Sequence, residues 1–420
     1  MKKLGCLFVY LILHLTAIND VKAQSGWIWQ NPSPQGKTLK DIHVFDENTA
    51  IAVGDSGTVI KTTDGGTSWV SLTGAGSDRL KSDYFIDSNT GWIVGNGGKI
   101  FKTTNGGTSW STQISGVTDP LYSVYFINSS TGWISGEDNT ILKTTNGGTD
   151  WVFQQDTLPK SVESIYFTDE NNGCAAGIDY DGNNYFGVII KTTDGGTNWT
   201  NQWSGNWLLS IHFTDSNNGW AAGAGIILKT TDGGTSWNPQ ITGTSYQLYS
   251  VHFSDSNLGW AVGYDGNASS GIILKTTNGG ISWNPQVSGK NNVLYSVHFA
   301  DLNNGWIVGE DGAILKTTNG GTTFIGEENS ELHSEFLLLQ NYPNPFNPST
   351  IIKYQIPEDG FVSLKIYDVL GKEVKTLVNE YKEIGRYEFK FDASTLSNGV
   401  YFYRIKVNDF ISSKKMLLLK

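Results

Sequence analysis

The chain has 420 residues, of which 16% are charged, and its formal net charge is -11. Fifty glycines and fifteen tryptophans exclude a mainly helical protein, because helices favour Ala, Glu, Lys and Leu and avoid glycine. The negative charge excludes electrostatic binding to nucleic acid or to an anionic membrane surface, since both require clustered Lys and Arg. We therefore expect an all-β protein with many tight turns and more than one folded unit.

The N-terminus has the three parts of a cleavable signal peptide, which we expect to occupy residues 1–23. Lys2 and Lys3 supply the basic start, residues 4–15 form an apolar run, and Ala23 ends the segment. The apolar run is too short to span a bilayer and no later stretch is long enough, so no transmembrane segment is expected. Removal of Cys6 with this peptide would leave Cys174 as the one cysteine, which excludes an intramolecular disulfide.

A nine-residue phrase, K-T-T-D-G-G-T-S-W, recurs through residues 24–325. With Asp/Asn exchange and other small changes it begins seven times, at Lys61, Lys102, Lys143, Lys191, Lys229, Lys275 and Lys316. The spacing of 38 to 48 residues is typical of a four-stranded propeller blade and exceeds that of a leucine-rich repeat. Each repeat holds four short β-branched and aromatic runs bounded by Gly, Asn or Asp, which predicts four strands. A parallel β-helix or an open array is the competing architecture, but shorter rungs and capping units would be expected there.

The start of the mature chain supplies an independent argument for a closed ring. Residues 29–36, which begin Trp29-Gln30-Asn31-Pro32, resemble the fourth strand of a later repeat that begins at Trp283, yet they precede the first complete repeat. The last copy of the phrase ends at Phe324 and lacks this continuation. We therefore predict that the N-terminal strand completes the seventh blade, which removes the exposed edges of an open stack.

The repeated phrase has a structural interpretation. Its Asp or Asn is expected to bond backbone amides two residues on, its glycines to adopt positive φ, and its Trp to anchor the hairpin between sheets. The phrase resembles the Asp-box of sialidases, sortilin-type receptors, BNR-repeat proteins and the photosystem II assembly and stability factor family, over about residues 25–325. That resemblance implies a seven-bladed propeller whose boxes lie on hairpins away from the active site. The Asp-box positions given a structural role are Asp64, Asn105, Asn146, Asp194, Asp232, Asn278 and Asn319.

The same resemblance allows sialidase activity to be tested. Sialidases clamp a substrate carboxylate with three arginines, because paired guanidinium groups match its geometry. Arg79 is the only arginine in residues 24–325. One guanidinium cannot reproduce that electrostatic site, so sialidase activity is disfavoured. Nothing in the sequence identifies a photosynthetic partner.

Alignment of the repeats places an imidazole or a phenol at one position of every innermost strand. These residues are His43, Tyr84, Tyr125, Tyr166, His212, His252 and His298. They line either a polar channel for a ligand or metal, or a packed layer in which the rings satisfy one another. We favour packing and expect no metal, because metal sites need particular geometry and carboxylate support.

The seven lysines that open the phrases are expected to be solvated or salt-bridged. Cys174 replaces a tryptophan of five other repeats and is expected to fill a core slot.

The repeat breaks in copies four and six, whose loops between the second and third strands, residues 178–186 and 264–270, are longer. In a propeller these loops share a face with the blade-to-blade connections, one of which is expected to carry Trp203 and Trp207. We predict that this face binds a glycan or a protein segment, because amphipathic aromatic side chains stack on sugars and serve as binding hot spots. Ordinary loop packing is the alternative. The candidate ligand-binding residues are Tyr180, Tyr185, Trp203, Trp207, Asp179, Asp181 and Asp265.

The loop carboxylates have two further interpretations. The run over residues 179–183 carries oxygen groups of the kind that calcium prefers, a weak signal alone. Paired carboxylates also perform glycoside hydrolysis, so the alternative to a binding module is a secreted glycoside hydrolase that acts on a polysaccharide through Asp179, Asp181 or Asp265. No catalytic residue is assigned, because the sequence fixes no separation between these groups.

A polar linker over residues 326–335 precedes a distinct domain over residues 336–420. Alternating strands at 351–356, 362–368, 385–392 and 399–407 predict a small antiparallel β-sandwich of the Ig-like kind. The segment opens N-Y-P-N-P-F, contains I-Y-D-V-L-G-K-E-V and L-S-N-G-V-Y-F-Y-R-I, and ends near the basic pair Lys414-Lys415. It resembles the type A sorting domain of the type IX secretion system. That resemblance implies export through the periplasm to the cell surface of a bacterium or to the medium, with the secretion machinery as a partner; an Ig-like domain that stays attached is the alternative.

Overall fold

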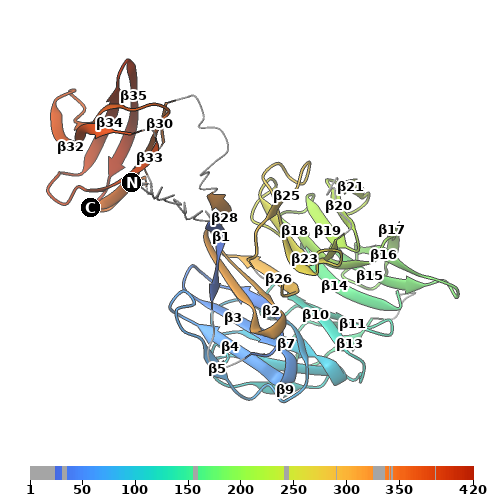
Figure 1. The fold of residues 1–420 in the computed structure, drawn as a ribbon. Coiled ribbons are helices and arrows are strands. Elements are labelled where there is room, and N and C mark those ends of the chain that lie inside the picture. Colours follow the sequence, from blue (N-terminus) through green and yellow to red (C-terminus); the bar gives the residue numbers. More distant parts are fainter. Residues whose placement is uncertain are drawn as a thin grey trace, which may run out of the picture. The chain divides into compact units, whose positions relative to one another are not determined.

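The computed structural model describes residues 24–30, 36–154, 159–240, 246–289, 291–324, 336–339, 341, 344–383 and 385–420. They belong to two compact units, one within residues 22–326 and one within residues 327–420 (Figure 1). The predicted signal peptide and the predicted linker lie outside the described residues. In the part of the chain that the structure describes, no helix is long and apolar enough to cross a membrane.

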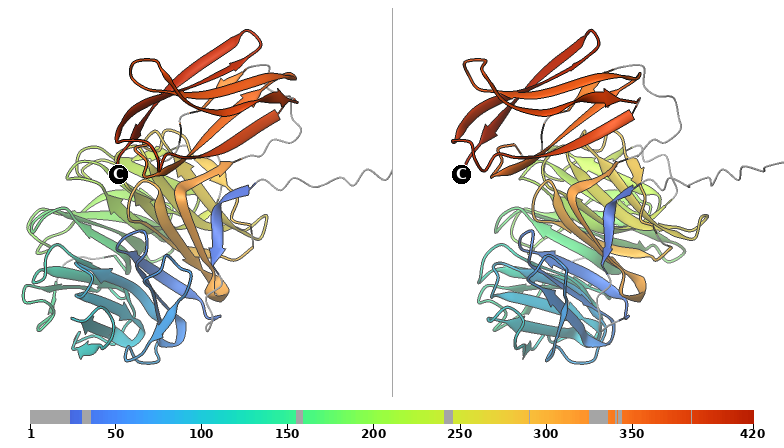
Figure 2. Two further views of the ribbon diagram at one scale, coloured as in Figure 1. Left: turned by 90° about the vertical axis from the view of Figure 1, so that its left-hand side faces the viewer. Right: turned by 60° about the vertical axis from the view of Figure 1, so that its left-hand side comes forward.

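The N-terminal unit consists of seven antiparallel sheets of four strands each, which confirms the predicted seven-bladed β-propeller (Figure 2). Blade 1 has β2 (Leu39–Val44), β3 (Ala50–Gly54), β4 (Thr58–Thr62) and β5 (Val70–Leu72). Blade 2 has β6 (Leu80–Phe85), β7 (Gly91–Gly95), β8 (Lys99–Thr103) and β9 (Ser111–Gln113). Blade 3 has β10 (Leu121–Phe126), β11 (Gly132–Gly136), β12 (Ile141–Thr144) and β13 (Val152–Phe153). Blade 4 has β14 (Ser161–Phe167), β15 (Gly173–Tyr180), β16 (Tyr185–Thr192) and β17 (Thr200–Gly205).

The remaining blades follow the same order. Blade 5 has β18 (Leu208–Phe213), β19 (Gly219–Gly223), β20 (Ile226–Thr230) and β21 (Asn238–Gln240). Blade 6 has β22 (Gln247–Phe253), β23 (Gly259–Asp265), β24 (Ser270–Thr276) and β25 (Asn284–Gln286). Blade 7 has β26 (Leu294–Phe299), β27 (Asn304–Gly309), β28 (Ile314–Phe324) and β1 (Gln24–Gln30). Short 3-10 turns, η1 (Asp55–Gly57), η2 (Asn96–Gly98) and η3 (Glu310–Gly312), join second to third strands.

Burial explains why the strands have these sequences. The second strand of a blade, such as β7, is buried at every position, because neighbouring blades cover both of its faces. The outer strand, such as β9, is mostly exposed and therefore carries polar residues. The innermost strands contact one another in sequence around the axis, and β26 contacts β2. The ring is therefore closed.

Strand β1 closes the ring as predicted, but in a different register. Ile28 pairs with Lys316 of β28, as Asn284 pairs with Lys275 in blade 6. Trp27, and not Trp29, is therefore the counterpart of Trp283. The Trp27 ring lies edge-on to Phe299 at 5.8 Å, and its Nε1 donates to the Gln286 side chain at 2.9 Å. The sequence alignment was thus wrong by two residues, because it matched the Trp, Asn and Pro letters of the two segments and not the alternation of side chains along the strand.

The Asp-box turn is held by its own side chains. Asp64 Oδ1 accepts from the Ser68 amide at 2.9 Å, four residues on and not two as expected. Thr62 Oγ1 accepts from the Gly66 amide at 2.9 Å, and both glycines of the turn have positive φ. Hydrogen bonds from the Ser68 hydroxyl and amide lower the pKa of Asp64 to about 2. The box carboxylate is therefore engaged in shaping its hairpin.

The lysines that open the repeats connect neighbouring blades, which corrects the expectation that they are solvated or salt-bridged. Lys102 Nζ donates to the carbonyl of Gly147 in the box of the next blade at 2.8 Å. Lys61, Lys143, Lys229 and Lys316 make the equivalent bond at 2.9–3.0 Å. Lys191 and Lys275 bond instead to threonine hydroxyls of the next box. These bonds tie each box to its neighbour.

The C-terminal unit packs two antiparallel sheets face to face. One sheet contains β29 (Leu337–Leu338), β30 (Ser349–Ile356) and β33 (Gly385–Asp392). The other contains β32 (Glu373–Lys382), β31 (Gly360–Tyr367), β34 (Gly399–Val407) and β35 (Phe410–Leu418). Side chains from both sheets share one buried cluster, which includes Ile352, Leu364 and Tyr403. The predicted sandwich is confirmed, although β29, β32 and β35 were not recognised in the sequence.

Candidate functional site

The hairpin between β15 and β16 extends beyond the rest of blade 4 and presents two tyrosines. Tyr180 and Tyr185 are cross-strand partners, and their ring centroids lie 4.7 Å apart. Their exposed fractions are 45% and 57%. The Tyr180 hydroxyl donates to the Gly182 carbonyl at 2.7 Å, which holds its ring over the loop. Two large aromatic side chains are therefore fixed in solvent by their own hairpin.

Trp207 lies next to this pair, in the connection from blade 4 to blade 5. It lies directly before β18 with 43% of its surface exposed, and its Nε1 donates to the Tyr185 carbonyl at 3.3 Å. Tyr180, Tyr185 and Trp207 form a cluster that we name the aromatic platform. An exposed group of this size has the chemistry of a recognition surface, since large apolar side chains exposed together mark binding sites.

Trp203, the fourth predicted member, lies elsewhere. It belongs to strand β17, opposite Ile189, and not to a loop as expected. Its half-buried ring packs against the core cluster that contains Cys174 and Phe213. The outer strand β17 has six residues, whereas those of blades 1, 2, 3, 5 and 6 have two or three, and this extra length places Trp203 within the sheet. Its contacts are those of a structural residue.

The three candidate carboxylates are occupied by their own loops. Asp179 Oδ1 accepts from the amides of Lys160 and Tyr180 at 3.2 and 2.9 Å. Asp181 Oδ1 accepts from the amides of Asn183 and Asn184 at 2.8 Å each, and these bonds lower its pKa. Asp265 holds the blade 6 hairpin in the same way, through the Asn267 amide at 2.9 Å. Among the described residues, no three His, Cys, Asp or Glu side chains form a metal-binding group.

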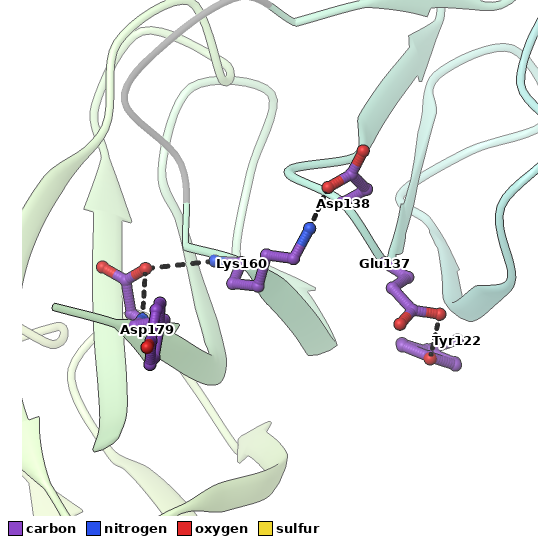
Figure 3. A network of polar contacts seen from close by, with 6 residues as sticks. Tyr122, Glu137, Asp138, Lys160 and Asp179 are labelled. Atoms are coloured by element: carbon purple, nitrogen blue, oxygen red, sulfur yellow. Dashed lines mark hydrogen bonds and ion pairs between the residues drawn. The ribbon is translucent and has the colours of Figure 1, made fainter. Parts of the chain in front are cut away.

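Two groups of polar contacts lie near the platform, and Asp138 and Glu137, which are neighbours in the chain, belong to one group each (Figure 3). Lys160 lies between two carboxylates. Its backbone amide donates a hydrogen bond to Asp179, and its ammonium group forms an ion pair with Asp138. The neighbouring Glu137 accepts from the Tyr122 hydroxyl at 3.0 Å. Since Tyr122 lines the mouth of the central channel, the platform and the channel mouth share one face.

The channel mouth is a cavity of about 340 Å³ with both charge signs on its wall. Lys40 and Lys81 stand on blades 1 and 2, and Glu163 stands on blade 4. The Lys40 ammonium lies 3.4 Å from the Tyr295 ring centroid, which is a cation-π contact. Burial lowers the pKa of Lys40 to about 8. The mouth is therefore polar, aromatic and partly desolvated.

Below the mouth, seven aromatic side chains form a closed ring around the axis. Successive ring centroids lie 4.5–5.9 Å apart from His43 through the tyrosines to His298, and His298 lies 5.0 Å from His43. Burial lowers the pKa of His212 and of His298 to about 4, so both are neutral near pH 7. His298 Nδ1 accepts from the Val44 amide at 2.9 Å. These contacts agree with the packing interpretation of the seven positions.

Two buried aspartates beside this ring were missed in the sequence. Asp41 replaces a serine of the other six repeats and accepts from the Asp83 amide at 3.1 Å and the Ser296 hydroxyl at 2.8 Å. Asp83 replaces a Val or Ile of the other repeats, is 6% exposed, and has no hydrogen-bond partner for either carboxyl oxygen among the described residues. Burial and the nearby Asp41 charge raise the pKa of Asp83 well above its usual value. An alignment of the seven innermost strands would have revealed Asp83 as the exception at their fourth position.

We expect Asp83→Val to raise the free energy of unfolding by about 1–3 kcal/mol near pH 7, because it removes an unsatisfied buried carboxyl. The pKa of Asp83 is raised in the native protein. At a pH between the ordinary Asp pKa and this raised pKa, the native protein therefore keeps a proton that the unfolded chain has released. The contribution of Asp83 to the free energy of unfolding therefore falls as the pH rises from the ordinary Asp pKa toward the raised pKa of Asp83. The Asp83→Val variant should not show this fall. Denaturant titrations at pH 5 and pH 8 measure both effects.

The matched control is Val124→Asp, which places a carboxyl at the equivalent buried position of blade 3. It should destabilise the protein by a similar amount and steepen the loss of stability with pH. An Asp83→Val protein less stable than the natural one at pH 8 would contradict the argument.

Two family models match this chain. One, described as "Photosynthesis system II assembly factor YCF48", matches residues 21–113, 76–206 and 203–289, more than half of the chain. The other, described as "Secretion system C-terminal sorting domain", matches residues 340–419. No curated protein matches the chain.

Solved structures show the same fold at low identity. A structure titled "YCF48 bound to D1 peptide" is 22% identical, covers 70% of this chain and 97% of its own, and has a TM-score of 0.57. YCF48 from Cyanidioschyzon merolae is 21% identical, with coverage of 69% and 98% and a TM-score of 0.56. PorZ, a bacterial surface component of the type IX secretion system of Porphyromonas gingivalis, is 14% identical, with coverage of 93% and 60% and a TM-score of 0.52.

Proposed function

Because the chain belongs to the family of photosynthesis system II assembly factor YCF48 and ends in a type IX sorting domain, we propose that it is an exported binding module whose propeller holds a ligand on the aromatic platform. The sorting domain indicates delivery to the bacterial cell surface or exterior by the type IX machinery. The one observation that carries the binding proposal is the exposure of Tyr180, Tyr185 and Trp207 together on a hairpin and connection of blade 4.

A glycan is the ligand that the platform supports best. Aromatic rings fixed by hydrogen bonds lose little entropy when a sugar stacks on them, and their faces match the apolar side of a pyranose. The Tyr180 hydroxyl and the Trp207 indole are bonded to backbone carbonyls, so their ring orientations are set in advance. Nearby amides and carboxylates of the hairpin, such as Asn183 and Asp181, can bond sugar hydroxyls at the edge of the platform.

A protein segment is the second candidate. A relative with the same fold carries a bound D1 peptide according to its title, which favours peptide recognition by a propeller of this family. The platform would then serve as a hot spot for an apolar side chain. The polar channel mouth on the same face, which Tyr122 lines, would suit a longer chain.

The glycoside hydrolase alternative has less support. Asp179, Asp181 and Asp265 each bond backbone amides of their own loops, and hydrogen bonds lower the pKa of Asp181. A general acid for glycoside cleavage needs the opposite shift. Turnover on a plant or microbial polysaccharide panel, lost on substitution of these aspartates, would favour the enzyme; saturable binding without turnover favours the module.

The double variant Tyr185→Ala/Trp207→Ala should weaken binding to any glycan or protein segment found on arrays by at least about tenfold, since each ring is worth roughly 0.5–1.5 kcal/mol beyond its area. Titration calorimetry measures the loss. Unfolding stability should change little, because both side chains are about half exposed.

Phe153→Ala provides the matched control, because Phe153 is 42% exposed on the outer strand of blade 3 and belongs to no part of the platform. It should leave binding unchanged. Trp203→Ala, by contrast, should lower stability, since Trp203 packs against the core. Equal affinity in the double variant and the natural protein would refute the platform proposal.

A further inference from the structure

The innermost strands of the seven blades differ most in the residue that follows the buried Leu or Val near their start. It is Lys in blades 1 and 2, Tyr in blades 3, 6 and 7, Glu in blade 4 and Leu in blade 5. These side chains line the cavity of about 340 Å³ at the channel mouth, whereas the next residue is Ser in six of the seven blades. Variation at one cavity-lining position of a regular repeat indicates a wall shaped for a ligand, since a cavity with a few convergent polar groups is the usual form of a binding site.

Lys40 and Lys81, on neighbouring blades, bring two ammonium groups to this wall. Their Nζ atoms lie 3.4 Å from the Tyr295 ring centroid and 5.3 Å from the Tyr122 ring centroid, respectively. In the part of the chain that the structure describes, neither ammonium group has a carboxylate oxygen within 4.0 Å. Burial lowers the pKa of Lys40 to about 8 and also lowers the pKa of Lys81, and the charge of Lys81 contributes to the shift at Lys40. Both lysines are partly desolvated cations that an anion between them would stabilise.

Four carboxylates are close enough to act on the charges of these lysines, and each has a partner of its own. The partners are Arg79 for Asp55, the Tyr122 hydroxyl for Glu137, the Ser161 hydroxyl for Glu163 and the Val293 amide for Glu310. Burial also raises the pKa of Glu163, which favours its neutral form. The acids at this level of the wall are therefore engaged, whereas the ammonium groups of Lys40 and Lys81 remain open to a ligand.

The layer beneath the lysines is a ring of serine hydroxyls, with Asp41 in place of serine in blade 1. Four of the hydroxyl oxygens accept from an amide of the next blade at 3.1–3.4 Å, those of Ser123, Ser164, Ser210 and Ser250. Their protons are therefore left to donate to a ligand in the cavity. Asp41 shows that this layer accommodates an acidic group, because it accepts from the Ser296 hydroxyl at 2.8 Å and from the Asp83 amide at 3.1 Å.

We propose that the channel mouth binds a sugar acid, that is, a single sugar with several hydroxyl groups and one acidic group. The acidic group lies between the ammonium groups of Lys40 and Lys81, because two charge-assisted bonds to one anion offset the repulsion between the lysines. The sugar hydroxyls bond the serine layer below. A cavity of about 340 Å³ is near the lower end of the range for ligand pockets, which suits one sugar residue. The site is independent of the aromatic platform, whose residues do not line this cavity.

The test is calorimetric titration of the full-length protein with glucuronate, glucose 6-phosphate and glucose. Glucuronate should bind at one site per chain and at least about tenfold more tightly than glucose, because only the acid uses the two ammonium groups. Binding of glucuronate without glucose 6-phosphate identifies a carboxylate ligand, and binding of both identifies a site for either acidic group. No binding of glucuronate, or equal binding of glucuronate and glucose, would overturn the proposal.

The variant Lys40→Gln/Lys81→Gln should weaken glucuronate binding at least about tenfold, since it removes both cations. Lys99→Gln is the matched control, because Lys99 is an exposed lysine of blade 2 that does not line the mouth, and it should leave binding unchanged. Unchanged affinity in a folded Lys40→Gln/Lys81→Gln protein would place the site elsewhere and refute the assignment. If that variant does not fold, the comparison of glucuronate with glucose on the natural protein decides.

Two further ligands test whether the site selects a sugar. Acetate carries the charge without the hydroxyl groups, and the dipeptide Glu-Glu carries acidic groups on a peptide, so both should bind more weakly than glucuronate. Equal affinity for either one would show a general anion site or a peptide site in place of a sugar site. The platform variant Tyr185→Ala/Trp207→Ala should bind glucuronate as the natural protein does, so failure of the platform proposal leaves this result unaffected.

Discussion

A chain that ends at residue 335 should fold its propeller but remain in the periplasm, with none at the cell surface or in the medium. The family match to the sorting domain covers residues 340–419, and the propeller forms a separate compact unit within residues 22–326. Loss of the sorting domain therefore removes the export signal without removing any strand of the propeller. Cell fractionation with an antibody against the propeller measures the effect, and thermal unfolding of the purified fragment shows whether it is folded.

The matched control for export is the full-length double variant Tyr185→Ala/Trp207→Ala, which keeps the sorting domain and should reach the surface or medium at normal levels. Normal external levels of the truncated chain would show that the C-terminal unit is an accessory domain and not the export signal.

Trp27→Ala should lower the free energy of unfolding by about 3–5 kcal/mol, the usual cost of removing a buried Trp. Trp27 is 3% exposed, lies edge-on to Phe299 and bonds Gln286, so it holds the strand that closes the ring. Deletion of residues 24–30 should have a still larger effect, because it leaves the β28 edge of blade 7 unpaired and open to association with other chains. Denaturant unfolding measures the first change, and light scattering detects the second.

Trp29→Ala is the matched control, since the two tryptophans are two residues apart on one strand and Trp29 is only half-buried. It should cost less than Trp27→Ala. The opposite order would show that Trp29 is the true counterpart of the other box tryptophans and that the register described here is wrong.

The candidate site was only partly visible in the sequence. Tyr180, Tyr185 and Trp207 do lie together, since the long hairpin and the connection meet at one end of blade 4. Trp203 does not, because the longer outer strand carries it into the sheet, where its ring packs on the core. Local sequence distinguishes a strand from a loop poorly when both contain aromatic and polar residues.

The sequence by itself determined the seven blades, the closure by an N-terminal strand and the C-terminal sandwich. These features follow from short-range patterns, such as the alternation along a strand and the Asp-Gly-Gly turn, which repeat at a fixed period. The sorting domain was equally visible, because its motifs are contiguous.

Only the tertiary structure decided how the blades meet. The Trp27 register, the lysine bonds to the next box, the unsatisfied Asp83 and the packing of Cys174 all depend on side chains that face each other across a blade interface. Such partners are about one repeat or more apart in the chain, and whether a neighbour fills, bonds or leaves a space depends on packing geometry. The sequence showed that the repeat departs from its pattern at Cys174 and in the long loops of blades 4 and 6, and the fold showed what these departures do and revealed the one at Asp83.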